Sequence, residues 1–89
     1  MQFKSFSWDL RNITHIADHH VTPEEAEEVC YNKPLIFKSR LERYYVLGRT
    51  DSGRYLTVIV AVQNKGIARV ITARGMSGSE RQRFQRKQL

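Results

Sequence analysis

The spacing of apolar residues changes near Pro34 and divides the chain into a helical part and a strand part. Before Pro34, apolar side chains recur every three or four residues, which is typical of helices. After Pro34 they alternate with polar side chains, which is typical of strands. The pattern predicts, in chain order, an edge strand within 3–8, a helix over 9–19, a second helix from 23, strands over 35–37, 43–50, 54–63 and 67–74, and a last helix over 77–87.

Local signals support the two N-terminal helices. The second starts with Thr22-Pro23-Glu24-Glu25, which combines a capping box with proline at the first helical position. Asn32-Lys33-Pro34 ends it, because the residue before a proline is pushed out of the helical region. In the first helix, four side chains share one direction, and we expect this stripe to be buried: Ile13, Ile16, Ala17 and His20.

The strand part predicts hairpins around a buried central strand. Asp51-Ser52-Gly53 and Asn64-Lys65-Gly66 are short glycine-containing connections of the kind that join antiparallel strands. The run from Leu56 to Val62 is apolar on both faces, so it belongs in the middle of the sheet. Two helices on one face of an antiparallel sheet make an α+β sandwich of two layers.

Size and composition favour one small domain. The chain has 89 residues, too few for two independent cores, so we expect a single domain over 1–89. No apolar run approaches the roughly 18 residues that span a bilayer, and the N-terminus has no stretch typical of a signal peptide. The single cysteine, Cys30, excludes an internal disulfide. We therefore expect a cytoplasmic protein with no membrane segment.

Charge is segregated along the chain. The formal net charge is +6, with 15 Lys and Arg against 9 Asp and Glu. Residues 1–32 hold two basic and six acidic side chains, a net −4, whereas residues 33–89 hold 13 basic and three acidic ones, a net +10. A fold that gathers the basic half on one surface would suit phosphate groups. The alternative is a solvated basic surface that only keeps the protein soluble.

A polar stripe of Asn12, His15 and His19 lies beside the predicted buried stripe of the first helix. Histidines four residues apart can bind zinc, but the pattern lacks the glutamate and the third ligand of a zinc motif, so we expect neither a metal nor another cofactor. The side chains could instead cap or bridge neighbouring backbone groups. A third interpretation is proton transfer or phosphate contact, since histidine exchanges protons near neutral pH.

Arginines stand at the ends of the predicted strands. Arg49 and Arg74 lie next to turns, and Arg54 follows the first hairpin connection. Guanidinium groups bind phosphate through paired hydrogen bonds and stay charged, so they can stabilise a pentacovalent phosphorus. Protection of sheet edges against aggregation is the competing interpretation. Glu80 either accepts a proton or simply closes a Ser77-x-x-Glu80 capping box.

Aromatic side chains offer a second way to contact nucleic acid. Five of them could act as stacking platforms for bases: Trp8, Tyr31, Tyr44, Tyr45 and Tyr55. Aromatic residues on strands more often pack against helices, so both interpretations stand at this point.

Three sequence blocks carry a resemblance. The first contains Trp8-Asp9, Asn12, His15-Ile16, His19, Val21-Thr22 and Glu24-Glu25; the second contains 45–50 and Gly53-Arg54-Tyr55-Leu56; the third contains 69–74, Met76 and Glu80-Arg81. In this order they resemble the BrnT family of toxins from bacterial type II toxin–antitoxin modules, over nearly the whole chain. Asp18 stands where many members of that family have lysine, so this position does not serve phosphate binding here.

The resemblance implies a RelE/ParE-like fold, an endoribonuclease that cleaves mRNA to stop translation, and a cognate BrnA-like antitoxin that forms a hetero-oligomer with it. The ribosome is a further partner that such activity suggests. By position, the resemblance points to His19, Arg49, Arg54, Arg74 and Glu80. We expect Arg49 and Arg74 to stabilise the phosphorane and Glu80 or His19 to transfer protons. The expected contacts to the RNA backbone are Arg54, Arg69, Arg83 and Lys87.

A function without catalysis stays open at this stage. The same basic scaffold could bind nucleic acid, a gyrase-type target or the antitoxin without cutting anything. Loss of toxicity in Arg74→Ala and Glu80→Ala would separate an enzyme from such a binding module.

Overall fold

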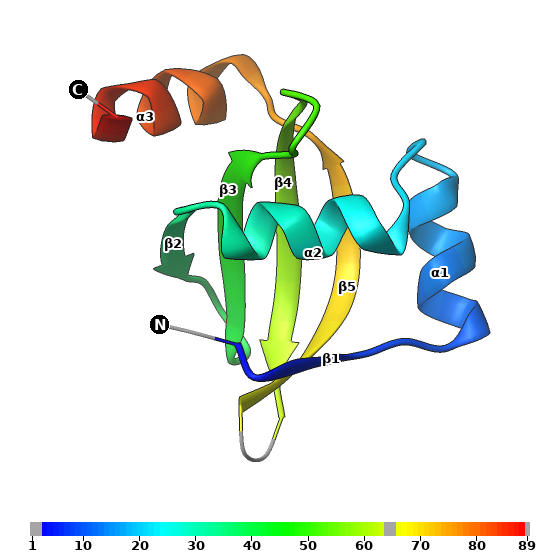
Figure 1. Ribbon diagram of the computed structural model, residues 1–89. Helices are drawn as coiled ribbons and strands as arrows, with labels where there is room; N and C mark the ends of the chain where they lie inside the picture. The colour runs from blue at the N-terminus through cyan, green and yellow to red at the C-terminus, as the bar shows by residue number, and fades with distance from the viewer. Residues whose placement is uncertain (1–2, 64–65, 89) are drawn as a thin grey trace.

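The computed structural model describes residues 3–63 and 66–88, and these ranges contain three helices and five strands (Figure 1). In chain order they are β1 (Ser5–Ser7), α1 (Leu10–Ala17), α2 (Pro23–Tyr31), β2 (Leu35–Lys38), β3 (Arg43–Arg49), β4 (Tyr55–Val62), β5 (Ile67–Gly75) and α3 (Gly78–Gln88). Every element that the sequence predicts is present, with small shifts at the boundaries. None of the described helices is long and apolar enough to cross a membrane.

The five strands form one sheet in the order β1-β5-β4-β3-β2. The central place of β4 confirms the prediction from its two apolar faces, and β3 and β5 are its antiparallel neighbours. β1 lies at the predicted edge but runs parallel to β5, with Ser5 opposite Ile67. The sheet is therefore mostly antiparallel, with one parallel pair at this edge, where no hairpin joins the two distant segments and fixes their direction.

Helices α1 and α2 cover one face of the sheet, and the core lies between them and the strands (Figure 1). Ile16 of α1 and Val29 of α2 are fully buried against Val46 and Val58 of the strands. Gly48 allows α2 to lie close to β3, because a Cβ atom at this position would sit 3.0 Å from the carbonyl oxygen of Val29.

Helix α1 is shorter than predicted and turned about its axis. It ends at Ala17, and His20 has a left-handed backbone (φ 60°) that cannot continue a right-handed helix. Its buried residues are Asn12 and Ile16, whereas Ala17 and His20 are exposed and Ile13 is 36% exposed. The predicted buried stripe is therefore wrong except at Ile16.

The side chain of Asn12 explains this rotation. Its amide nitrogen donates to the carbonyl oxygens of Ser7 at 3.0 Å and Val70 at 3.3 Å. Its amide oxygen accepts from the backbone N–H of Asp9 at 2.8 Å, while Asp9 caps the helix by accepting from the backbone N–H of Asn12. One buried amide thus joins α1 to β1 and β5. For Asn12, the interpretation as a bridge to backbone groups is confirmed.

The first predicted hairpin connection is also confirmed. The backbone N–H of Thr50 donates to the carbonyl of Arg54 at 2.9 Å, and Gly53 adopts a φ of 98°, which favours glycine. The second predicted connection, Asn64-Lys65-Gly66, includes residues 64 and 65, which lie outside the described residues.

Helix α3 packs against the other face of the sheet, at the end where β4 begins and β5 ends. Alternation along the strands and their register place one set of side chains on this face, which we call the open face: Phe37, Tyr45, Leu47, Arg49, Tyr55, Thr57, Ile59, Thr72 and Arg74. Phe84 is the buried apolar anchor of α3 and meets the Tyr55 ring edge-on, at 6.0 Å between centroids.

We expect Asn12→Ala to lower the free energy of unfolding by about 2 kcal/mol, because two backbone carbonyls in the interior lose their side-chain donor. Chemical denaturation of the purified protein measures this change. Thr14→Ala is the matched control, since Thr14 is exposed on the same helix and should leave stability near that of the wild type. Equal stability of Asn12→Ala and the wild type would contradict the anchoring role.

Candidate functional site

Arg74 and Glu80 form a two-point ion pair where β5 leads into α3. Arg74 Nη1 lies 2.7 Å from Glu80 Oε1, and Nη2 lies 3.0 Å from Oε2. Glu80 Oε1 also accepts from the hydroxyl of Thr57 at 3.0 Å and from the backbone N–H of Ser77 at 2.8 Å. The Ser77 hydroxyl accepts from the backbone N–H of Glu80, which completes the capping box that the sequence predicts.

These contacts stabilise the ionised form of Glu80. The hydrogen bonds from Arg74 lower the pKa of Glu80 to about 2, with further contributions from Ser77 and Thr57 that outweigh the opposing effect of burial. The same pair raises the pKa of Arg74. Glu80 is therefore a carboxylate at all pH values near neutrality, and it fixes the plane of the Arg74 guanidinium.

Two further arginines rest on the ring of Tyr55, at the start of β4. The guanidinium carbon of Arg81 lies 4.0 Å from the ring centroid, and that of Arg49 lies 4.8 Å from it. A hydrogen bond with Gln85 and the positive charge of both arginines lower the pKa of Tyr55. Within the described residues, neither arginine has a carboxylate within 4.0 Å, so both keep an uncompensated positive charge.

We call this group the arginine cluster; it comprises Arg49, Tyr55, Arg74, Glu80 and Arg81. A cavity of about 400 Å³ borders it, between the β3–β4 connection and the start of α3. Its lining residues are Gly53, Arg54, Tyr55, Leu56, Gly75, Met76 and Arg81. The two glycines leave the rim without side chains beside Arg54 and Arg81, the two cations that line the cavity.

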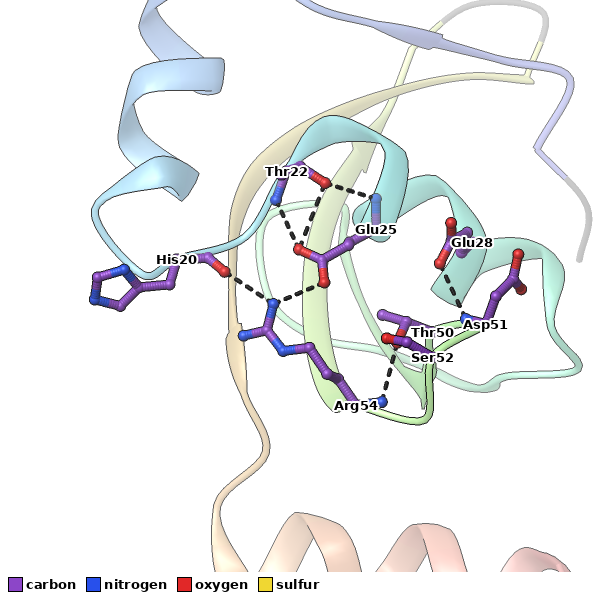
Figure 2. A network of polar contacts seen from close by, with 8 residues as sticks. All are labelled: His20, Thr22, Glu25, Glu28, Thr50, Asp51, Ser52 and Arg54. Carbon is purple, nitrogen blue, oxygen red and sulfur yellow. Dashed lines mark hydrogen bonds and ion pairs between the residues drawn. The ribbon is translucent and has the colours of Figure 1, made fainter.

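Arg54 lines this cavity, but the protein itself binds one end of its guanidinium. Arg54 Nη1 donates to Glu25 Oε2 at 2.8 Å and to the carbonyl oxygen of His20 at 2.9 Å, and Figure 2 marks both contacts with dashed lines. Burial opposes ionisation of Glu25, yet the hydrogen bonds from Arg54 and Thr22 keep its pKa below the usual value. Arg54 thus ties the β3–β4 connection to the turn between α1 and α2.

A second contact secures the same connection. The backbone N–H of Asp51 donates to Glu28 Oε1 at 3.0 Å, and the amide of Asn32 donates to the carboxylate of Asp51 at 2.9 Å (Figure 2 shows the first of these). The acidic face of α2 therefore holds the hairpin that carries Arg49 and Tyr55. Acidic side chains of residues 1–32 thus hold a segment of the basic half of the chain in place.

The remaining predicted RNA contacts are dispersed. Arg83 lies over the Phe37 ring, 4.1 Å from its centroid, and Lys87 is exposed further along α3. Arg69 is near the start of β5, where it pairs with Asp9 at 2.8 Å. It borders a separate cavity of about 870 Å³ between α1 and β5. The structure therefore places Arg69 outside the arginine cluster.

His19 follows the end of α1. Its ring meets that of His15 edge-on, with 5.7 Å between centroids. In the described part of the chain, no three His, Cys, Asp or Glu side chains gather in a way that could hold a metal ion. The next residue, His20, provides the carbonyl that binds Arg54, so the turn carrying His19 is tied to the cavity wall.

The structure adds Arg81 and Thr57 to the residues that sequence reasoning singles out. Arg81 follows Glu80 directly, and its place in the third sequence block is a signal that could have identified it. Thr57 gives no such signal, because its role depends on the register that sets it opposite Arg74 across β4 and β5. Tyr55, for which base stacking and packing against a helix were both open, packs against Phe84 of α3 and also supports two arginines.

Among solved structures, the chain is similar to the Brucella abortus ribonuclease toxin BrnT, whose crystal structure has a resolution of 1.1 Å. The TM-score is 0.69 at 21% sequence identity, and the alignment covers 82% of this chain and 96% of the other. At this identity the likeness shows a shared fold, which confirms the predicted α+β architecture. No curated protein sequence matches the chain significantly.

A family model supplies the stronger link. The model described as "Ribonuclease toxin, BrnT, of type II toxin-antitoxin system" matches residues 8–80. The match runs from α1 to the first turn of α3 and includes Arg49, Arg74 and Glu80. The chain therefore belongs to the BrnT family of ribonuclease toxins of type II toxin–antitoxin systems.

Proposed function

We propose that this protein is an endoribonuclease that cleaves mRNA at the arginine cluster, without a metal ion, and so inhibits translation. The observation that carries the proposal is the pair of uncompensated guanidiniums, Arg49 and Arg81, on Tyr55 and beside the Arg74–Glu80 pair. Arg81 lines the small cavity, and Arg49 and Arg74 belong to the same cluster beside it. Guanidiniums in this arrangement suit a phosphate that gains negative charge during reaction.

In the proposed reaction, the ribose 2′-oxygen attacks the adjacent phosphorus and the bond from phosphorus to the 5′-oxygen breaks. The products are a 2′,3′-cyclic phosphate and a free 5′-hydroxyl. A base takes the proton of the 2′-hydroxyl, and an acid returns a proton to the leaving 5′-oxygen. Arg49 and Arg74 stabilise the pentacovalent intermediate, and we add Arg81 to them because its charge is uncompensated.

Glu80 and His19 divide the remaining roles in this proposal. A carboxylate with a pKa of about 2 is a weak base, so Glu80 acts mainly by holding Arg74 in position. His19 is then the proposed proton carrier, because imidazole is the commonest general acid and base in enzymes and the neighbouring His20 is bound to Arg54 at the cavity rim. The exposed cations Arg83 and Lys87 extend the path of the RNA backbone along α3, and Arg54 contributes at the cavity rim.

The type II toxin–antitoxin family implies a cognate antitoxin as partner. We propose that a cognate BrnA-like antitoxin forms a hetero-oligomer with the toxin and covers the open face, and that the ribosome presents the mRNA. Both proposals follow from the type II toxin–antitoxin family and from the basic charge of the face.

Arg74→Ala should reduce RNA cleavage by about 100- to 1,000-fold, because a preorganised donor to the developing charge is lost. Cleavage of purified RNA with excess EDTA, followed by detection of 2′,3′-cyclic ends, measures the effect. Arg86→Ala, an exposed arginine on α3, should keep near wild-type activity. If Arg74→Ala and Glu80→Ala both still arrest growth while folded, the catalytic assignment fails and a binding module becomes the better description.

Arg81→Ala should weaken binding to single-stranded RNA similarly across sequences. It should also reduce the slope of log affinity against log salt by about 0.7, the amount expected for one lost phosphate contact. Binding titrations over a range of salt concentrations measure both quantities. An unchanged slope, in a variant with wild-type thermal stability, would show that Arg81 does not contact phosphate.

Glu80→Gln should change how stability depends on pH. Because the folded-state pKa of Glu80 is about 2, below its ordinary value, ionisation of Glu80 contributes stability above about pH 4.5. We expect a contribution of about 3 kcal/mol at neutral pH that disappears as the pH falls toward about 2. Denaturation curves of wild type and variant should converge in that range. Glu24→Gln, at an exposed site on α2, should show no such convergence.

A further inference from the structure

Next to the arginine cluster, the open face carries three planar groups in a row. The rings of Phe37 on β2 and Tyr45 on β3 are stacked, with 5.3 Å between centroids and 17° between planes. On Phe37, the guanidinium of Arg83 lies 4.1 Å from the ring centroid. Phe37 thus lies between Arg83 and Tyr45, and Tyr45 ends the row.

Tyr45 differs from the other aromatic candidates for base stacking. Tyr44 packs against the core on the opposite face, and Trp8 does the same while donating a hydrogen bond to Glu27. Tyr55 already supports two arginines. Tyr31 is on α2, on the other side of the sheet, where it meets Phe6 edge-on.

The space beside Tyr45 is bounded by small or aliphatic side chains. On the side of Tyr45 away from Phe37, its neighbour on β4 is Ile59, and the neighbour of Ile59 on β5 is Thr72. Tyr45, Ile59 and Thr72 are each partly exposed. In the described part of the chain, Tyr45 has no second ring or guanidinium as a partner.

This end of the row is close to the proposed phosphate site. Arg74 lies opposite Thr57, which lies opposite Leu47, only two residues along β3 from Tyr45. Two residues of strand correspond to about 7 Å along the sheet, and the two strand spacings from β3 to β5 add about 10 Å across it. The pKa of Arg74 is raised first by its hydrogen bond with Glu80 and, to a smaller extent, by Tyr45, which places the two side chains in each other's field.

We propose that Tyr45 binds a nucleobase of single-stranded RNA, which stacks on its free face over Ile59 and continues the row formed by Arg83, Phe37 and Tyr45. The base belongs to a nucleotide that flanks the phosphate at Arg74. Stacking of this kind requires an unpaired base, so it selects single-stranded over double-stranded RNA and tolerates different bases. The inference rests on the proposed function, because it assumes that RNA reaches Arg74.

The test uses the full chain and a short single-stranded 2′-fluoro oligonucleotide, which lacks the 2′-hydroxyl and cannot be cleaved by the proposed reaction. An abasic site is placed at each position in turn, and affinity is measured at fixed salt. For the wild type, one position should lose affinity by about 5- to 100-fold when its base is absent. Tyr45→Leu should lose a similar factor with the intact oligonucleotide and should no longer respond to the abasic site.

Two variants control for structure and chemistry. Tyr45→Phe keeps the ring and should bind as the wild type does, and Tyr31→Leu removes a tyrosine from the opposite side of the sheet. Thermal melts check that each variant is folded, and the abasic scan of the wild type needs no variant at all. No abasic effect at any position, an abasic penalty that persists in Tyr45→Leu, or no detectable binding would each overturn the proposal.

The outcome is separable from that of the proposed function. Tyr45-dependent binding without cleavage of natural RNA would support the base site and reject the ribonuclease mechanism. Cleavage of natural RNA with no effect of Tyr45→Leu on affinity would reject the base site alone.

Discussion

The carboxylate of Glu80 is the contact on which the arrangement of the arginine cluster depends. It joins Arg74 of β5, Thr57 of β4 and the N-terminal backbone of α3. Because four donors converge on one carboxylate that is only 16% exposed, the carboxylate stays ionised and the donors stay in place. The orientation of Arg74 and the start of α3, and therefore the position of Arg81 one residue later, follow from the same interaction.

The acidic and basic parts of the chain have complementary roles in this arrangement. Glutamates of α2 hold the β3–β4 connection through Arg54 and through the backbone of Asp51. The opposite face of the sheet carries arginines that rest on rings or, in one case, pair with Glu80. The net charge of +6 therefore understates the field at the open face, since much of the negative charge is on the other side of the sheet, on α2.

The strands could be predicted because alternation of apolar residues is a direct consequence of the pleat, and the central place of β4 could be predicted from its two apolar faces. The rotation of α1 about its axis could not be predicted from the sequence. It arises because Asn12 enters the interior and donates to two carbonyl oxygens that only the folded chain brings near it. The direction of β1 is likewise a matter of tertiary packing. At the site, the strand-end position of Arg74 and the capping pattern of Glu80 were visible in the sequence. Their pairing through Thr57, and the use of Tyr55 as a support, required the register of β4.

The rings under the arginines have a consequence for the thermodynamics of binding. A long guanidinium side chain normally loses much rotamer freedom when it grips a ligand. Here Tyr55 restrains Arg49 and Arg81, and Phe37 restrains Arg83, before any ligand arrives. That loss of entropy is part of folding rather than of association. The open face is thus preorganised, so that restricted side-chain motion as well as charge would favour the phosphate binding that we propose for it.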